Sequence, residues 1–317
     1  MRYGFGVDIL GTHIKFGFFK ETGELLEKWQ IALPGYKDSS QIIPTIAEEV
    51  ERYLTARGIF EDDVLGIGVG IPGPVSSTGV VNKCVNFSWG VFNIDRALSG
   101  LTGLPVKSSN TANLAALGES WKGQGSRNMV FMAMNVGLGG GVICEGTLVN
   151  GAAGGAGEIG HIIVNKQETE SCTCGKCGCV EQYCSPKGVV RVARRILNSS
   201  KTASVLRSKR SFDYPDVLAA AAGGDKLAKA VMDQVYDYTG QALASVCCVT
   251  NPDTIVLGGE FIRIGQSAMD GIARAFGRYV FHANENVRFR FAALGQDDAI
   301  YGAFRLAYNT FADGARK

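Results

Sequence analysis

The sequence has no excess of charge of either sign and no segment of low complexity. Its 317 residues contain 32 Lys and Arg against 30 Asp and Glu, which leaves a net charge of +2 at pH 7. A chain with so balanced a charge is not expected to have nucleic acid or an anionic membrane as its main partner. With 46% hydrophobic and 20% charged residues it also falls outside the disordered, collagen-like and coiled-coil classes.

A long apolar run is also lacking. The uncharged run 128–144 has 17 residues and contains Asn135 and four glycines, whereas about 20 apolar residues are needed to span a bilayer. Near the N-terminus, Asp8 stands where a signal peptide would have its apolar core. We therefore expect no transmembrane segment, no membrane partner and a cytoplasmic location.

Glycine and cysteine, by contrast, are plentiful. The 42 glycines make up about 13% of the chain, against a usual level of about 7%, so many positions are expected to need a positive φ or the close approach of a ligand. Nine cysteines in a reducing compartment argue against a disulfide framework, and five of them fall between Cys172 and Cys184. That clustering indicates a metal site.

Strands and helices alternate along the chain. Residues 3–19 predict a strand, a turn and a second strand, and apolar residues at a spacing of four predict a helix from Ile42 to Leu54. The same order of elements begins again near residue 129, each time with a glycine-rich turn after the first strand. The repeated order predicts two similar α/β lobes, although the two halves do not match closely in sequence.

The lobes are expected to be divided by a cleft. At about 150 residues per domain, a chain of 317 residues is long enough for two domains. We predict an N-terminal lobe over residues 1–118, joined by a C-terminal helix over 298–317 that Asp298 caps. The second predicted lobe covers residues 119–297 and carries a zinc-binding loop.

The zinc prediction comes from one short segment. Five candidate ligands lie within 19 residues, namely His161, Cys172, Cys174, Cys177 and Cys179. Tetrahedral zinc needs four, and a site closed by four protein ligands is structural rather than Lewis-acidic. The alternative is a set of reactive or merely buried thiols. Cys177 is the ambiguous member of the group, and Cys184 is expected on the following helix.

A basic segment, residues 191–195, follows the cysteine cluster. Its sequence is Arg-Val-Ala-Arg-Arg. We interpret it as a solvated helix face. An anion-binding site is the alternative.

Six motifs occur along the chain in an order that resembles one known family. They are Asp8-x-x-Gly11-Thr12, Gly70-Ile71-Pro72-Gly73-Pro74-Val75, Asn110-x-Ala112-Asn113, Gly137-x-Gly139-Gly140-Gly141, Gly157-Glu158-Ile159-Gly160-His161 and Cys172-x-Cys174-Gly175-x-x-Gly178-Cys179-x-Glu181. With these motifs the chain resembles the ROK family of bacterial sugar kinases and repressors over nearly its whole length, and most of all the glucokinase branch. ROK repressors carry a further N-terminal helix-turn-helix. This sequence starts directly at the first predicted strand, so we expect it to resemble the kinases.

The resemblance implies an actin-like, ribonuclease H-like fold of two lobes, a homodimer or homotetramer, and ATP-dependent phosphorylation of a hexose 6-hydroxyl, with glucose as the first substrate expected. It assigns the sugar hydroxyls to Asn110, Glu158, His161 and Glu181. It assigns the nucleotide to Asp8, Gly11, Thr12, Gly137, Gly139, Gly258 and Gly259, and a structural zinc ion to His161, Cys172, Cys174 and Cys179.

These assignments agree with the chemistry of the residues. Carboxylates and amides hydrogen-bond several hydroxyls at once. Zinc on one ring nitrogen of His161 would fix its tautomer and direct the other nitrogen at the sugar. Metal and sugar binding are therefore expected to be coupled. The alternative for Glu158 and Glu181 is a surface carboxylate without a ligand.

Four residues depart from the family pattern. Thr111 stands where the family has the aspartate that takes the proton from the sugar hydroxyl, and a hydroxyl cannot be that base. Leu10 and Glu260 replace glycines of the nucleotide-binding loops. Val136 replaces a threonine and lacks the hydroxyl that would bond a phosphate.

All four departures fall on the side of nucleotide binding and proton transfer. We therefore predict a hexose-binding protein whose phosphorylation of the sugar is weak or absent, with Mg-ATP doubtful as a cofactor. One alternative is a slow but functional glucokinase in which another carboxylate, Asp8, takes the proton. A second is a non-enzymatic sugar sensor or regulatory subunit.

Overall fold

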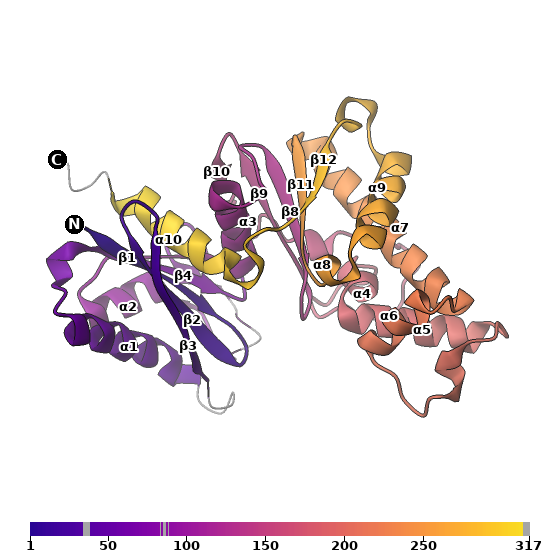
Figure 1. Cartoon of the computed structure of the whole chain (residues 1–317), viewed down its shortest axis with the longest axis horizontal. Helices are drawn as coiled ribbons and strands as arrows, with labels where there is room; N and C mark the ends of the chain where they lie inside the picture. The colour runs from indigo at the N-terminus through magenta and orange to yellow at the C-terminus, as the bar shows by residue number, and fades with distance from the viewer. Residues whose placement is uncertain (34–38, 83, 85–86, 88, 313–317) are drawn as a thin grey trace. The chain divides into compact units, whose positions relative to one another are not determined.

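The structure is a computed structural model that describes residues 1–33, 39–82, 84, 87 and 89–312 (Figure 1). The chain forms two compact units. The first unit comprises residues 1–127, 141–157 and 293–317, and the second comprises 128–140 and 158–292. The lobe bounds expected from the sequence stay a prediction. Among the described residues, no helix has the length and apolar character that a membrane span requires.

The first unit is built on a five-stranded sheet in the order β3-β2-β1-β4-β7. Its strands are β1 (Tyr3–Ile9), β2 (His13–Lys20), β3 (Leu25–Ala32), β4 (Val64–Ile71) and β7 (Val106–Asn110). Strands β1, β2 and β3 are antiparallel neighbours, whereas β4 runs parallel to both β1 and β7. The strand, turn and strand predicted over residues 3–19 are thus confirmed. A separate pair consists of β5 (Val80–Val81) and β6 (Phe92–Asn93).

Four α-helices of the described residues belong to this unit. They are α1 (Ile42–Arg57), α2 (Ile94–Thr102), α3 (Thr111–Lys122) and α10 (Asp298–Phe311). Helix α1 confirms the helix predicted from Ile42 to Leu54. Helix α10 is the predicted C-terminal helix, but residues 313–317 of that prediction lie outside the described residues.

The two faces of the first sheet are covered in different ways. On one face, apolar side chains of the strands, such as Phe5 and Val7, form a core with apolar residues of α1 and α2. On the opposite face lies α10 (Figure 1), where Gly6 and Gly68 face its backbone. A Cβ atom on Gly68 would overlap the carbonyl group of Ala303, so the helix can approach the strands only because these residues have no side chain.

The second sheet has the order β10-β9-β8-β11-β12. Its strands are β8 (Met129–Met134), β9 (Leu138–Cys144), β10 (Thr147–Leu148), β11 (Thr254–Gly259) and β12 (Arg288–Phe291). Strand β11 is parallel to both β8 and β12. Strands β8, β11 and β12 belong to the second unit, while β10 belongs to the first.

The helices of the second unit follow the cysteine-rich segment. They are α4 (Glu181–Cys184), α5 (Pro186–Ser199), α6 (Tyr214–Ala222), α7 (Lys226–Thr250), α8 (Glu260–Ile264) and α9 (Gln266–Tyr279). Helices α7 and α9 lie side by side (Figure 1), with Gly240 against Ala275 and Phe276 and Gly271 against Tyr236. Because glycine has no side chain, these two helices can lie close together.

Replacing Gly68 by Ala should destabilise the protein, because the added methyl group would displace α10 from the strands. We expect a loss of about 1–3 kcal/mol in the free energy of unfolding, as in other overpacked sites. Gly100→Ala is the matched control, since this exposed glycine of α2 has open space around it and should gain about 0.5–1 kcal/mol of helix stability. Urea unfolding measures both variants. An equal effect of the two would contradict the packing argument.

Candidate functional site

The residues of the predicted zinc site lie together in the second unit. The ligand atoms of His161, Cys172, Cys174 and Cys179 all lie within 4.8 Å of one another. The sulfur atoms of Cys174 and Cys179 are 3.6 Å apart, and the Cys172 sulfur lies 3.7 Å from Nδ1 of His161. Ligands arranged tetrahedrally around zinc, with Zn–S bonds of about 2.3 Å, are separated by about 3.5–3.8 Å. The four residues therefore fit one tetrahedral ion.

Glycines let the cysteine segment fold back on itself. Gly175 and Gly178 have φ values of +84° and +85°, which favour glycine over other residues. A Cβ atom on Gly178 would also overlap the carbonyl oxygen of Asn165. The Gln182 side chain accepts hydrogen bonds from the backbone N–H groups of Gly178 and Cys179, at 2.7 and 3.1 Å. These contacts hold Cys179 in place.

The other two cysteines of the segment lie outside the four-residue cluster. The thiol of Cys177 lies 3.7 Å from the carbonyl oxygen of Thr169. Cys184 is the last residue of α4, as the sequence predicts, and its thiol donates to the carbonyl oxygen of Val235 at 3.3 Å. Burial raises the pKa of the Cys184 thiol to about 12. Cys177 is not among the four residues whose ligand atoms lie together, so the geometry favours Cys179 over Cys177 as a candidate ligand.

His161 has a different neighbour at each ring nitrogen. Its Nδ1 faces the sulfur of Cys172, and its Nε2 lies 3.9 Å from a carboxylate oxygen of Glu158. Burial raises the pKa of Glu158; the charge of His161 opposes this effect, and the nearby carboxylate of Glu181 adds to it. The structure therefore brings together three of the four residues assigned to the sugar.

Glu181 begins α4, and protein groups bind both of its carboxylate oxygens. Oε2 accepts a hydrogen bond from the backbone N–H of Leu138 at 2.9 Å, and Oε1 accepts one from the Thr173 hydroxyl at 3.3 Å. A Cβ atom on Gly137 would overlap Oε2 of Glu181. Gly137, which the resemblance assigns to the nucleotide, therefore also makes room for Glu181.

Asn110, the fourth residue assigned to the sugar, lies in the first unit, at the end of β7. Its side-chain oxygen accepts a hydrogen bond from the N–H of Ala112 at 2.7 Å and so caps α3. Thr111 is the first residue of α3, and its hydroxyl donates to Oδ1 of Asp8 at 2.8 Å. Asp8 is 3% exposed. Burial raises its pKa to about 6, against the opposing effects of the Thr111 hydrogen bond and the charge of Lys15.

Asp298 also lies in this region, but its role differs from the helix cap that its sequence position predicts. It does not cap α10, because it is already the first helical residue and its carboxylate accepts from the N–H of Ala299 at 2.7 Å. Burial, followed by the negative charge of Asp8, raises the pKa of Asp298 to about 8. Two acids at the start of a helix look like capping residues in a sequence. Their proximity to Asp8 depends on the packing of α10 on the sheet.

The first nucleotide-binding motif forms the turn between β1 and β2. The N–H of Leu10 donates to the carbonyl oxygen of His13 at 2.9 Å, which closes the turn around Gly11 and Thr12. The Thr12 hydroxyl is hydrogen-bonded to the His13 ring at 2.9 Å. Leu10 is only half-buried, so its apolar side chain occupies a turn that the resemblance assigns to phosphate.

The second motif connects β8 to β9. The N–H of Asn135 donates to the carbonyl oxygen of Gly137 at 2.9 Å. Val136, at the tip of this turn, is 84% exposed. Gly139 lies in β9. Position 136, where the family has a threonine, is therefore open to solvent, and Val136 has no hydroxyl to offer a phosphate.

The third motif ends β11. Gly258 packs against the Phe131 ring, while Gly259 has a φ of +63° that favours glycine. Glu260 begins α8, where the guanidinium of Arg263 lies 3.0 Å from its carboxylate. The negative charge expected near the nucleotide is thus paired with a cation.

A buried ion-pair network ties α5 to the segment that precedes Cys172. The side chain of Glu168 is 1% exposed, and Arg195 binds it with two hydrogen bonds of 2.9 and 3.1 Å. Arg191 lies 2.6 Å from the same carboxylate, and the Tyr183 hydroxyl donates to it at 2.5 Å. Arg195 first, with Tyr183 and Arg191, holds the pKa of Glu168 well below its usual range. Arg194 and Arg195 are exposed, as the interpretation of residues 191–195 as a solvated face predicts, whereas Arg191 is half-buried and paired with Glu168.

The chain is similar to known proteins over nearly its whole length. A model of the ROK family matches residues 4–310. A glucokinase of Halalkalibacterium halodurans is 35% identical over 313 residues, which cover 95% of this chain and 93% of the relative. The crystal structure of a ROK hexokinase from Thermus thermophilus superposes with a TM-score of 0.84 at 29% identity and covers 98% of this chain and 100% of its own. A ROK glucokinase from Streptomyces griseus, in complex with glucose and AMPPNP, has a TM-score of 0.75 at 28% identity, with 97% and 99% covered. The predicted α/β class and two-lobe actin-like fold are confirmed.

Replacing Glu168 by Gln should destabilise the protein by about 3 kcal/mol at neutral pH, because two guanidinium groups lose a buried partner. The depressed pKa means that the stabilisation is complete above about pH 4.5, the value expected for an unfolded Glu, and is lost as the pH falls below it. The difference between wild type and variant should therefore shrink on acidification.

Urea unfolding at several pH values measures this effect. Glu170→Gln is the control, since this carboxylate binds the same two arginines but is 62% exposed and should cost less than about 1 kcal/mol. A pH-independent difference between wild type and Glu168→Gln would contradict the ion-pair account.

Proposed function

The chain belongs to the ROK family, and from this premise we propose that it binds a hexose, glucose first, while its ATP-dependent phosphorylation of the sugar 6-hydroxyl is weak or absent. The hydrogen bond from Thr111 to Asp8 carries this proposal. At the position of the proton-accepting aspartate there is a hydroxyl that already acts as a donor to a buried carboxylate. Loss of a general base lowers a rate by about 10² to 10⁴.

The retained sugar residues support the binding part of the proposal. Glu158, His161 and Glu181 lie together in the second unit and offer carboxylate and imidazole groups to sugar hydroxyls. The related Streptomyces griseus enzyme was crystallised with glucose. Asn110, whose side chain caps α3, is proposed to contact the sugar as well. A homodimer or homotetramer of this chain remains part of the proposal.

The phosphate side supports weak catalysis. Leu10 places an apolar side chain in the first turn, and Val136 offers no hydroxyl in the second. The pairing of Glu260 with Arg263 reduces the repulsion that Glu260 alone would exert on a triphosphate. Leu10 and Val136 are therefore the main reasons to expect weak binding of Mg-ATP.

We propose that the His161, Cys172, Cys174 and Cys179 cluster holds a structural zinc ion. Bound there, zinc would supply no open coordination position, because four protein ligands close the site. His161 would use Nδ1 toward the metal and keep Nε2 protonated on the side of Glu158. The imidazole would then donate a hydrogen bond in a fixed direction.

A second candidate is a slow glucokinase in which Asp8 accepts the proton. The position of Asp8 beside Thr111 and its pKa of about 6 favour this alternative. Its rate should rise with pH through about 6, because only the ionised carboxylate accepts a proton. If Asp8 does not accept the proton either, the protein would bind the sugar without turnover and act as a sensor or regulatory subunit.

The expected turnover with glucose, mannose or N-acetylated sugars is about 10² to 10⁴ below that of an active ROK glucokinase. Thr111→Asp alone should recover little of it, because Leu10 and Val136 remain. Thr111→Ser is the matched control and should behave like the wild type. A coupled assay of ADP release measures all three. Ordinary turnover in the wild type would refute weak catalysis, and full recovery by Thr111→Asp would show that the phosphate loops are intact.

Replacing Cys174 by Ala should remove the metal and weaken glucose binding together, because zinc fixes the His161 ring. Cys177→Ala is the matched control, since Cys177 lies outside the cluster, and should keep both properties. Elemental analysis gives the metal content and calorimetry the glucose affinity. Loss of the metal with unchanged glucose affinity would contradict the coupling.

A further inference from the structure

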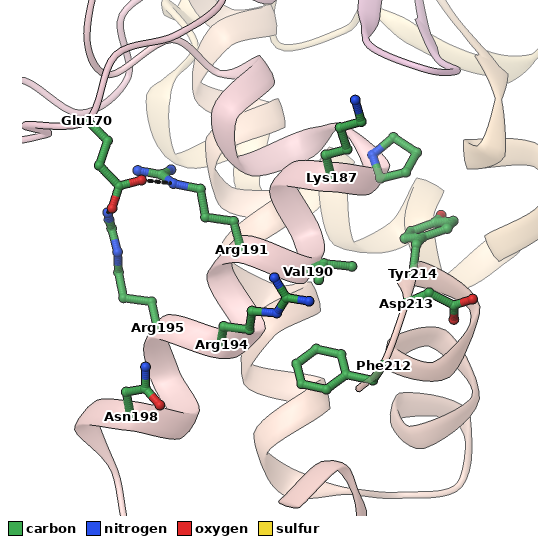
Figure 2. A pocket seen from close by; sticks show the side chains of 11 residues that line it. Glu170, Lys187, Val190, Arg191, Arg194, Arg195, Asn198, Phe212, Asp213 and Tyr214 are labelled. Atoms are coloured by element: carbon green, nitrogen blue, oxygen red, sulfur yellow. Dashed lines mark hydrogen bonds and ion pairs between the residues drawn. The ribbon is translucent and has the colours of Figure 1, made fainter. Parts of the chain in front are cut away.

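A hollow of about 730 Å³ lies in the second unit, along one face of α5 (Figure 2). Its wall is formed by α5 between Pro186 and Asn198 and by the segment from Phe212 to Tyr214, with Glu170 at its rim. Pockets for small molecules usually have volumes of about 300–1,000 Å³. Neither the sugar residues nor the cysteine cluster contributes to this lining.

Some of the cations that line the pocket are paired with acids of the protein, and others are not. Arg191 and Arg195 bind Glu168 and Glu170, and Figure 2 shows both side chains directed toward Glu170. These two arginines therefore have their partners within the protein. They hold the wall of the pocket to the segment before the cysteine cluster.

Lys187 and Arg194, in contrast, make no ion pair with any residue that the structure describes. Both are exposed residues of α5 that line the pocket. They are seven positions apart, which corresponds to about 10 Å along a helix. The pocket thus offers two cations, about two helical turns apart on α5, that are in no ion pair with a described acid.

The position of Arg194 is set by an aromatic ring. Its guanidinium carbon lies 5.6 Å from the centre of the Phe212 ring, a cation–π contact that directs the side chain across the pocket (Figure 2). Val190 lies between Lys187 and Arg194 on the same wall. The floor between the two cations is therefore apolar.

One further acid lines the pocket. Asp213 is the N-cap of α6, where its carboxylate accepts a hydrogen bond from the N–H of Asp216 at 3.1 Å. The negative charge of Asp213 offsets one of the two positive charges of Lys187 and Arg194, so one positive charge remains in excess. An anion is therefore expected to lie along α5, away from Asp213.

We propose that this pocket binds a small organic anion with two phosphate or carboxylate groups. One anionic group pairs with Lys187 and the other with Arg194, while the body of the ligand covers Val190. A volume of about 730 Å³ favours a small molecule over a protein segment. This site is separate from the proposed hexose site and does not depend on it.

The test is calorimetric titration of the full chain with fructose 1,6-bisphosphate, a probe with two phosphates, in saturating glucose to exclude it from the hexose site. Citrate provides the carboxylate probe, and inorganic phosphate the single anion. At least one of the two larger probes should bind with one site per chain and more tightly than phosphate. Arg194→Gln and Lys187→Gln should each weaken that binding about tenfold or more, the effect of losing one charge-assisted hydrogen bond.

Arg274→Gln is the matched control, because Arg274 is an exposed residue of α9 outside the pocket lining. It should bind the probe as the wild type does. The proposal is overturned if neither fructose 1,6-bisphosphate nor citrate binds, if inorganic phosphate binds equally well, or if Arg194→Gln and Arg274→Gln have the same affinity.

Discussion

The direct packing of α10 on the strands of the first unit places the acids around the candidate catalytic position. Gly6 and Gly68 have no side chains, so the backbone of the helix lies against the sheet. Asp8 follows Gly6 on the same side of β1, since side chains alternate along a strand. It therefore meets the start of α10 at Asp298 and the start of α3 at Thr111. The raised pKa values of the two acids are consequences of this close packing.

The second unit is organised around a different constraint, which is that a short segment must bring three cysteine sulfur atoms close to one another and to the ring of His161. Glycines with positive φ give the segment its turns, and Gln182 binds the backbone next to Cys179. The same segment is held to α5 through Glu168. The four candidate metal ligands, Glu158, Glu181 and α5 all belong to this one unit, so a change at the cysteine cluster is expected to reach the histidine that faces Glu158.

Much of this could be predicted from the sequence, because periodicity and motifs are local properties. The hairpin at the N-terminus, the helix from Ile42 and the cysteine cluster each show in a short window of residues. The spacing of the cysteines alone left Cys177 as an alternative ligand; the resemblance assigned Cys179 instead, and the four residues that it assigned lie together in the structure. The ion pairs of Arg191 and Arg195 were also missed, since their partners lie 21 or more residues away in the chain. The same limit applies to Asp298, whose neighbour Asp8 lies at the other end of the sequence.

The central claim is that this chain keeps the groups that bind a hexose and has lost those that bind a triphosphate. The most direct measurement is a calorimetric titration with glucose, carried out with and without a non-hydrolysable ATP analogue. The account predicts that glucose binds with the same affinity in both conditions and that the analogue alone binds weakly at most. An analogue that binds and tightens the affinity for glucose would contradict it.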